Sequence, residues 1–311
     1  MSIHHHNHEH HGHGHHHGHH HHIDPSTMSE QKLWWAVAAN GLLTLAQVVG
    51  GILSGSLSLV ADALHNLSDA ASLFIALIAI RIGRKPADAN KTFGYKRAET
   101  IAALMNLTSL IIIGFYLCYE AILRFINPEP IAGWTVVIIA SVALIVDIFT
   151  AALTYSQSKN SMNMRAAFLH NITDAMASIA VIISGALILL YGWVWTDALM
   201  TLLIAGFVLK QGFTEIPQVI HLLMEGSPVH INRNDITHEM EHIEGVLNTH
   251  HIHLWQIDEH RIAMEAHVVI NPDFNMDTIK VELKKMLQHK FHIDHSTLEF
   301  EYKPCEHPAH S

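Results

Sequence analysis

Two short segments of this sequence each carry a histidine and an aspartate four residues apart, inside separate long apolar runs. Residues at this spacing lie on one face of a helix, one turn above the other, so each helix would present two ligand atoms side by side. Ionisable side chains are costly at membrane depth and usually mark an ion pathway. We therefore predict a metal site inside a membrane, formed by His65, Asp69, His170 and Asp174.

The chemistry of these four side chains indicates which ions they would bind. Two imidazole nitrogens and two carboxylate oxygens suit tetrahedral zinc and also tolerate cobalt or cadmium. The ligands must lose their protons to bind metal, so metal and protons compete for the site, which is the physical basis for exchanging zinc for protons. The simpler alternative is two polar pairs that join helices by hydrogen bonds, but this role does not require His and Asp at matched spacing twice.

Two further aspartates, Asp62 and Asp147, also lie within apolar runs. Each would face water, hold a metal ligand in place or make a structural hydrogen bond, and the sequence favours the structural role as much as the other two.

The elements that must position these residues follow from composition and hydropathy. The chain has 311 residues, of which 50% are hydrophobic and 15% charged, whereas soluble domains average about 25% charged. Six apolar stretches are each close to the roughly 20 residues that span a bilayer. They lie at about 33–53, 57–81, 98–122, 132–154, 165–191 and 197–220. The second and fourth connections carry most of the loop Lys and Arg, so the positive-inside rule places both termini in the cytoplasm.

The remainder of the chain predicts a polar domain and a tail. We expect a His-rich, disordered, metal-binding cytoplasmic tail at 1–28, a six-helix transmembrane domain at 29–225, and a cytoplasmic α+β regulatory domain at 226–311. A purification tag is the alternative for the His-rich tract. In the last domain a helix, two strands, a helix and a strand are predicted, in the order αββαβ, at about 232–243, 246–257, 261–270, 276–290 and 295–302.

Charge and cysteine content exclude other classes of protein. The net charge is −10 with the 30 histidines counted as neutral, so no basic surface for nucleic acid is implied. Only two cysteines are present, Cys118 and Cys305, which rules out a disulfide framework.

Several motifs together resemble one known family over residues 33–303. They are the segments 56–69, 93–99, 170–174 and 250–255, with Asn106 in the third span. The chain resembles the cation diffusion facilitators, most closely the bacterial cobalt, cadmium and zinc exporters. The resemblance implies a homodimeric zinc/proton antiporter of the bacterial inner membrane, with six spans per subunit and a ferredoxin-like, metallochaperone-like cytoplasmic domain. It also implies that the four intramembrane residues form the transport site, that membrane lipid and divalent metal ions are the other partners, and that no organic cofactor is bound.

The resemblance extends to a second, cytoplasmic zinc site. Family members with zinc in this domain use histidines like His250, His267 and His295, and His253 lies beside them on an alternating strand. An acidic residue is expected two positions after the last histidine, where this chain has Thr297, so Cys305, Glu306 or His307 are the alternative ligands. Surface histidines without metal are the competing interpretation. Thr92 and Tyr95 stand where some members carry histidines in the loop between spans two and three, so we predict no zinc site there.

Three rival functions remain to be weighed. Residues 238–242 match the H-E-x-x-H signature of zinc proteases, but they lie on a short amphipathic helix without a clear third ligand. A membrane zinc sensor that does not transport would have little reason to hide its metal at the bilayer midplane. A transporter of the same fold for cadmium, cobalt or nickel is the third alternative, and the sequence does not separate cadmium from zinc.

Overall fold

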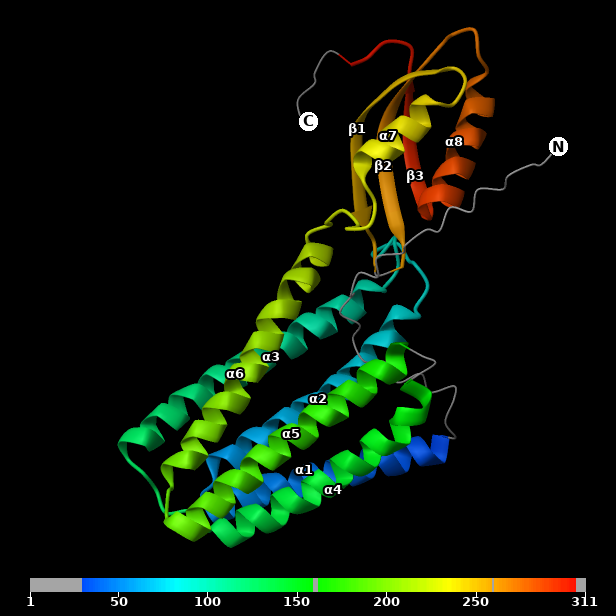
Figure 1. The fold of residues 1–311 in the computed structure, drawn as a ribbon. Coiled ribbons are helices and arrows are strands. Elements are labelled where there is room, and N and C mark those ends of the chain that lie inside the picture. The colour runs from blue at the N-terminus through cyan, green and yellow to red at the C-terminus, as the bar shows by residue number, and fades with distance from the viewer. Residues whose placement is uncertain (1–29, 159–161, 259, 306–311) are drawn as a thin grey trace, which may run out of the picture.

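The computed structural model describes residues 30–158, 162–258 and 260–305, and within them a bundle of long helices carries a small α+β domain at one end (Figure 1). The His-rich tract at 1–28, and the alternative ligands Glu306 and His307, lie outside the described residues. The long helices are α1 (Glu30–Ser54), α2 (Leu57–Gly83), α3 (Arg97–Ile126), α4 (Gly133–Ser158), α5 (Met162–Tyr191) and α6 (Trp195–Leu223). The six predicted spans all lie on these helices, which begin and end within a few residues of the expected bounds.

Hydropathy supports a membrane location for the bundle. In the described residues, five helices are long and apolar enough to cross a membrane, and the described apolar part of α1, Gly41–Ser54, is shorter. Large apolar side chains such as Ile112, Phe149 and Leu190 are exposed on the outside of the bundle. Lipid rather than water must cover such faces, because a soluble protein rarely exposes large contiguous apolar surfaces.

The helices are arranged so that α2 and α5 lie between two pairs, α1 with α4 and α3 with α6 (Figure 1). Small residues allow close approach between neighbouring helices, as is usual in membranes. At Gly185 on α5, an added Cβ would lie 2.8 Å from a side-chain methyl of Val137 on α4. The contact between α4 and α5 therefore depends on the absence of a side chain at this position.

The C-terminal domain has the predicted order αββαβ. It contains α7 (Arg233–Glu241), β1 (Val246–Gln256), β2 (Ile262–Ile270), α8 (Met276–Phe291) and β3 (Ile293–Glu301). The sheet order is β1-β2-β3, with β1 and β2 antiparallel and β2 and β3 parallel. A parallel pair needs a crossover connection, which α8 provides. Apolar side chains of α7 and α8, including Met240, Leu283 and Leu287, bury against Met264 and Ile270 of β2. The predicted fold class is confirmed.

The domain meets the membrane helices at the loop between α2 and α3. Arg97, the first residue of α3, donates from Nε to the carbonyl of Ile257 at 3.1 Å. Arg261, just before β2, donates from Nη2 to the carbonyl of Phe93 in the loop at 3.2 Å. The first turn of α3 and the preceding loop are thereby joined to the hairpin between β1 and β2.

Candidate metal centres

The four intramembrane residues singled out from the sequence come together between α2 and α5. Nε2 of His65 lies 3.7 Å from Oδ2 of Asp69 and 3.6 Å from Oδ1 of Asp174. Nε2 of His170 lies 3.4 Å from Oδ2 of Asp69 and 3.5 Å from Oδ2 of Asp174. Bonds of about 2.0 to 2.2 Å in a tetrahedral zinc site place neighbouring ligand atoms about 3.3 to 3.6 Å apart. These four contacts are close to the spacing in a zinc site, and His65, Asp69 and Asp174 form a group whose ligand atoms all lie within 4.8 Å of one another. His170 meets this group through the two carboxylates, and its ring centroid lies 6.2 Å from that of His65.

The two helices contribute equivalent positions. His65 is eight residues after Leu57, where α2 begins, and His170 is eight residues after Met162, where α5 begins. Consecutive helices of the bundle alternate in direction, so α2 and α5 are antiparallel (Figure 1). At 1.5 Å per residue the two His-Asp pairs lie about 12 to 18 Å from opposite ends of their helices, near the middle of a core about 30 Å thick.

Burial of the cluster is uneven. The side chains of His65 and Asp174 are 6% and 9% exposed, whereas those of Asp69 and His170 are 32% and 29% exposed. Within the described part of the chain, Oδ1 of Asp174 is buried without a hydrogen bond. A buried carboxylate oxygen without a donor is costly, and a cation would relieve that cost. The cluster thus has a buried side, formed by His65 and Asp174, and a partly exposed side, formed by Asp69 and His170.

The two additional aspartates both make hydrogen bonds between helices. Asp62 is fully buried, and its Oδ2 accepts from Nε2 of Gln47 on α1 at 2.7 Å. The amide of Asn66 donates to Oε1 of the same Gln47 at 3.2 Å, so the network ends on the residue beside His65. On α4, Asp147 accepts from Oγ of Ser178, one turn beyond Asp174, at 2.9 Å. Each network fixes the helix that carries a His-Asp pair against a neighbour.

A second cluster of potential ligands forms on the C-terminal sheet. His250, His267, Glu301 and Cys305 each offer one ligand atom, and these atoms lie within 4.8 Å of one another. Nδ1–H of His267 donates to Oε1 of Glu301 at 2.7 Å, and Nε2 of His250 lies 3.4 Å from Oε2 of Glu301 and 3.3 Å from Sγ of Cys305. The donor set of two imidazoles, a carboxylate and a thiol suits zinc.

An irregularity in β1 adds a further histidine to this cluster. The pairing of β1 with β2 shifts between His250 and His253, and His251 has a positive φ of 49°. As a result the rings of His250 and His251 both lie near the ring of His267, at centroid distances of 5.3 and 4.9 Å. Sequence reasoning did not select His251 or Glu301, because a bulge and the register of a parallel strand leave no clear signal in the sequence.

Two of the predicted cytoplasmic ligands are not in this ligand group. His295 pairs with Ala263 in the sheet, whereas His267 pairs with Glu299, four residues further along β3. The ring of His295 instead packs edge-on against Phe93 at 5.4 Å. His253 lies opposite Glu265, on the far side of the bulge from His250. The structure thus brings His250 and His267 together with Cys305, one of the alternative ligands. His253 lines a small pocket with His251 and His267 but is not in the ligand group, and His295 packs against Phe93.

The protease-like motif lies at the end of α7. The rings of His238 and His242 are 4.0 Å apart, but Oε2 of Glu239 accepts from Nζ of Lys290 at 2.5 Å. This hydrogen bond from the ammonium group lowers the pKa of Glu239. The carboxylate that would activate water is thus held by a cation of α8.

Comparison with known proteins assigns both parts of the chain to one family. Residues 33–224 match the model of the cation efflux transmembrane domain, and residues 228–303 match that of the cation efflux protein cytoplasmic domain. A cadmium, cobalt and zinc/H(+)-K(+) antiporter of Bacillus subtilis is 38% identical over 85% of this chain and 86% of its own. The zinc transporter ZitB of Escherichia coli is 34% identical over 91% of each chain. The metal cation efflux system protein CzcD of Cupriavidus metallidurans is 34% identical, over 89% of this chain and 88% of its own.

Proposed function

The chain belongs to the cation efflux family, and we propose that it exports zinc in exchange for protons through the His-Asp cluster between α2 and α5. The family and the names of its relatives establish a divalent-cation efflux transporter of the membrane rather than an enzyme. The observation that supports the proposed site is that Nε2 of each imidazole lies 3.4 to 3.7 Å from an oxygen of each of the two carboxylates.

Proton coupling follows from the chemistry of the ligands. Zinc binds neutral imidazole and ionised carboxylate, so loading the site expels protons, and protons that enter from the opposite side displace the zinc. If the site opens alternately to the two faces of the membrane, a difference in pH drives zinc against its gradient. We infer that the ion reaches the cluster from the side of His170 and Asp69, because these two side chains are partly exposed.

The metal itself is proposed to be zinc. Two nitrogens and two oxygens in a tetrahedral arrangement fit zinc well, and ZitB of Escherichia coli is named as a zinc transporter. The Bacillus subtilis relative is also named for cadmium and cobalt, which tolerate the same ligands. Competition between these metals in a flux assay would rank them.

Zinc flux into proteoliposomes under an imposed pH gradient tests the proposal. The unaltered protein should carry zinc in proportion to the gradient, and Asp174→Asn, which keeps the shape of the side chain but removes its charge, should abolish that flux. Asp273→Asn changes an exposed carboxylate of the C-terminal domain and is the matched control. Flux that survives in Asp174→Asn would show that the transport site lies elsewhere, and zinc binding without flux in the folded, unaltered protein would favour a sensor.

The cytoplasmic cluster is proposed as a regulatory zinc site. Its ligands come from β1, β2, the end of β3 and the residues after it, so bound zinc would fix the tail at Cys305 onto the sheet. We propose that the protein acts as a homodimer through this domain, in the bacterial inner membrane with both termini in the cytoplasm. The domain lies in the cytoplasm, from which the transporter would remove zinc. Cytoplasmic zinc that binds the domain would then bias the conformations of the transporter.

A further inference from the structure

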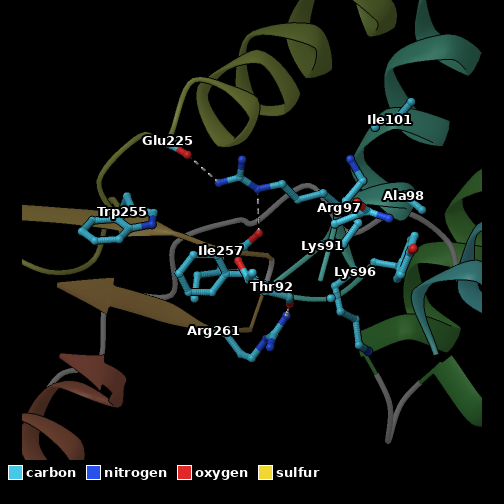
Figure 2. Close-up of a pocket in the computed structure, with 14 residues that line it drawn as sticks. Lys91, Thr92, Lys96, Arg97, Ala98, Ile101, Glu225, Trp255, Ile257 and Arg261 are labelled. Carbon is cyan, nitrogen blue, oxygen red and sulfur yellow. Dashed lines mark hydrogen bonds and ion pairs between the residues drawn. The ribbon is translucent and has the colours of Figure 1, made fainter. Parts of the chain in front are cut away.

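A pocket of about 440 Å³ lies at the junction of the membrane helices and the C-terminal domain (Figure 2). It is bounded by the loop residues 90–96, the first two turns of α3, Glu225 after α6, and the end of β1 with the hairpin that follows. None of its described lining residues belongs to either ligand cluster. A role for this pocket must therefore come from its own side chains.

Most of the charged side chains that line the pocket are cationic. Four of its lining side chains are cationic, Lys91, Lys96, Arg97 and Arg261, and one is anionic, Glu225. The two arginines are engaged, Arg97 with Glu225 at 3.1 Å and Arg261 with Asp258 at 2.6 Å, as Figure 2 shows for the first pair. Among the described residues, the ammonium groups of Lys91 and Lys96 have no hydrogen-bond or ion-pair partner. A nearby carboxylate, that of Asp88, accepts from the backbone N–H of Lys91 at 2.8 Å, and its pKa is lowered by a hydrogen bond from Tyr95 and in part by the charge of Lys91. The pocket thus offers two ammonium groups without a direct ion pair for binding an anion.

The pocket also has an apolar side that leads into the membrane. Ile101, in the second turn of α3, is half exposed at its edge. Met105 and Ile112, four and eleven residues further along α3, continue the same helix face and are also exposed. Trp255 lines the pocket as well, and tryptophan is typical of the membrane–water interface. Because α3 is a membrane-spanning helix, its first two turns place the pocket at the depth of the lipid headgroups.

We propose that this pocket binds the phosphate headgroup of an anionic phospholipid from the leaflet on the side of the C-terminal domain. The phosphodiester would accept charge-assisted hydrogen bonds from Lys91 and Lys96, and an acyl chain would lie along Ile101 and Met105. A free phosphate shares the headgroup chemistry but makes no use of the apolar face. The bound lipid would touch the loop, α3 and the β1–β2 hairpin together, and so would stabilise the attachment of the domain to the membrane helices.

Retention of single lipids by the purified full-length protein in native mass spectrometry tests the proposal. The double variant Lys91→Gln/Lys96→Gln removes the two lysine cations. The matched control Arg81→Gln/Arg84→Gln removes two cations at the C-terminal end of α2 that are also exposed but do not line the pocket. We expect the unaltered protein and the control to retain phosphatidylglycerol, retention to fall at least five-fold in the lysine variant, and phosphatidylcholine to show no such difference. Equal retention of phosphatidylglycerol by the two double variants would overturn the proposal.

A second measurement separates the lipid from a free anion and checks folding. Phosphatidylglycerol should raise the thermal unfolding midpoint of the unaltered protein and the control by several degrees more than that of the lysine variant, while inorganic phosphate should have no effect. Stabilisation by inorganic phosphate that is lost in the lysine variant would assign the pocket to a free anion instead.

A third variant tests the contact with the acyl chain. Ile101→Gln leaves every charge in place and should still weaken retention of the lipid; unchanged retention would remove the acyl contact from the proposal. Neither assay requires transport, so the result is independent of the proposed antiport.

Discussion

The carboxylate of Asp197, in the first turn of α6, accepts a hydrogen bond from the backbone N–H of Leu57, where α2 begins, at 2.7 Å. The same carboxylate accepts from the hydroxyls of Ser56 and Ser58, both at 2.6 Å, and is almost fully buried. An anion at a helix N-terminus satisfies free N–H groups and interacts favourably with the helix dipole. Asp197 therefore fixes the start of the helix that carries His65 and Asp69, although it lies far from both.

Asp197→Ala should destabilise the protein and displace the proposed transport site. The substitution leaves buried hydroxyl and N–H donors without an acceptor, at a cost of about 3 kcal/mol. We expect a lower thermal midpoint in detergent and a marked loss of zinc flux. Asp273→Ala, at an exposed turn, should change neither. An unaltered midpoint in Asp197→Ala would mean that the cap is replaced by water or by a neighbouring side chain.

Gln47→Leu should weaken zinc binding without removing a ligand. Gln47 joins Asp62 to Asn66, beside His65, and groups that orient metal ligands affect affinity by about 10- to 100-fold. Zinc affinity in detergent, measured by competition with a chelating dye, should fall by about 10-fold. Gln211→Leu is the matched control, because the amide of Gln211 donates to Glu215 within α6 and joins no two helices. Equal affinities in the two variants would show that the network has only a structural role.

The membrane helices and the four proposed ligands could be predicted from the sequence because both depend on local patterns. A span is a local property of about 20 residues, and a pair four residues apart shares a helix face wherever the helix packs. No local sequence pattern indicated that Asp197 would cap a helix that begins 140 residues earlier, because this contact depends on the packing of α2 against α6.

The cytoplasmic ligands show the limit of the same reasoning. Alternation along a strand assigns faces only while the strand is regular, and β1 is interrupted between His250 and His253. The register of β3 against β2 is set by tertiary packing, so the sequence could not show that Glu299 and Glu301, rather than His295, lie at the level of His267.

The ion pair of Asp258 with Arg261 should contribute stability that depends on pH. Burial opposes ionisation of Asp258, but hydrogen bonds from the backbone of His260 and from Arg261 outweigh it and lower its pKa. A carboxyl group with a lowered pKa in the folded state stabilises the fold above its unfolded pKa of about 3.9, and this contribution is lost as the pH falls through the folded value. The difference in thermal midpoint between the unaltered protein and Asp258→Asn should therefore be largest above pH 5 and should shrink toward pH 3. A difference that stays constant over this range would contradict the assignment.

Cys305→Ser should separate the two proposed zinc sites. Sγ of Cys305 lies 3.3 Å from Nε2 of His250 and 3.8 Å from Nε2 of His251, and serine is a much poorer zinc ligand than thiolate. By elemental analysis, the purified variant should bind about one zinc ion fewer per subunit than the unaltered protein, and Asp174→Asn should lose the zinc ion of the membrane site instead.

The flux of the same variant is a second test. Because the cysteine lies outside the membrane helices, proton-driven flux at saturating zinc should persist in Cys305→Ser. The dependence of that flux on internal zinc should change if the cluster is regulatory. Cys118→Ser, on α3, removes the second thiol and is the control. Unchanged stoichiometry in Cys305→Ser would show that the histidines and Glu301 bind zinc without the thiol, or that the cluster binds none, and His267→Ala would distinguish these outcomes.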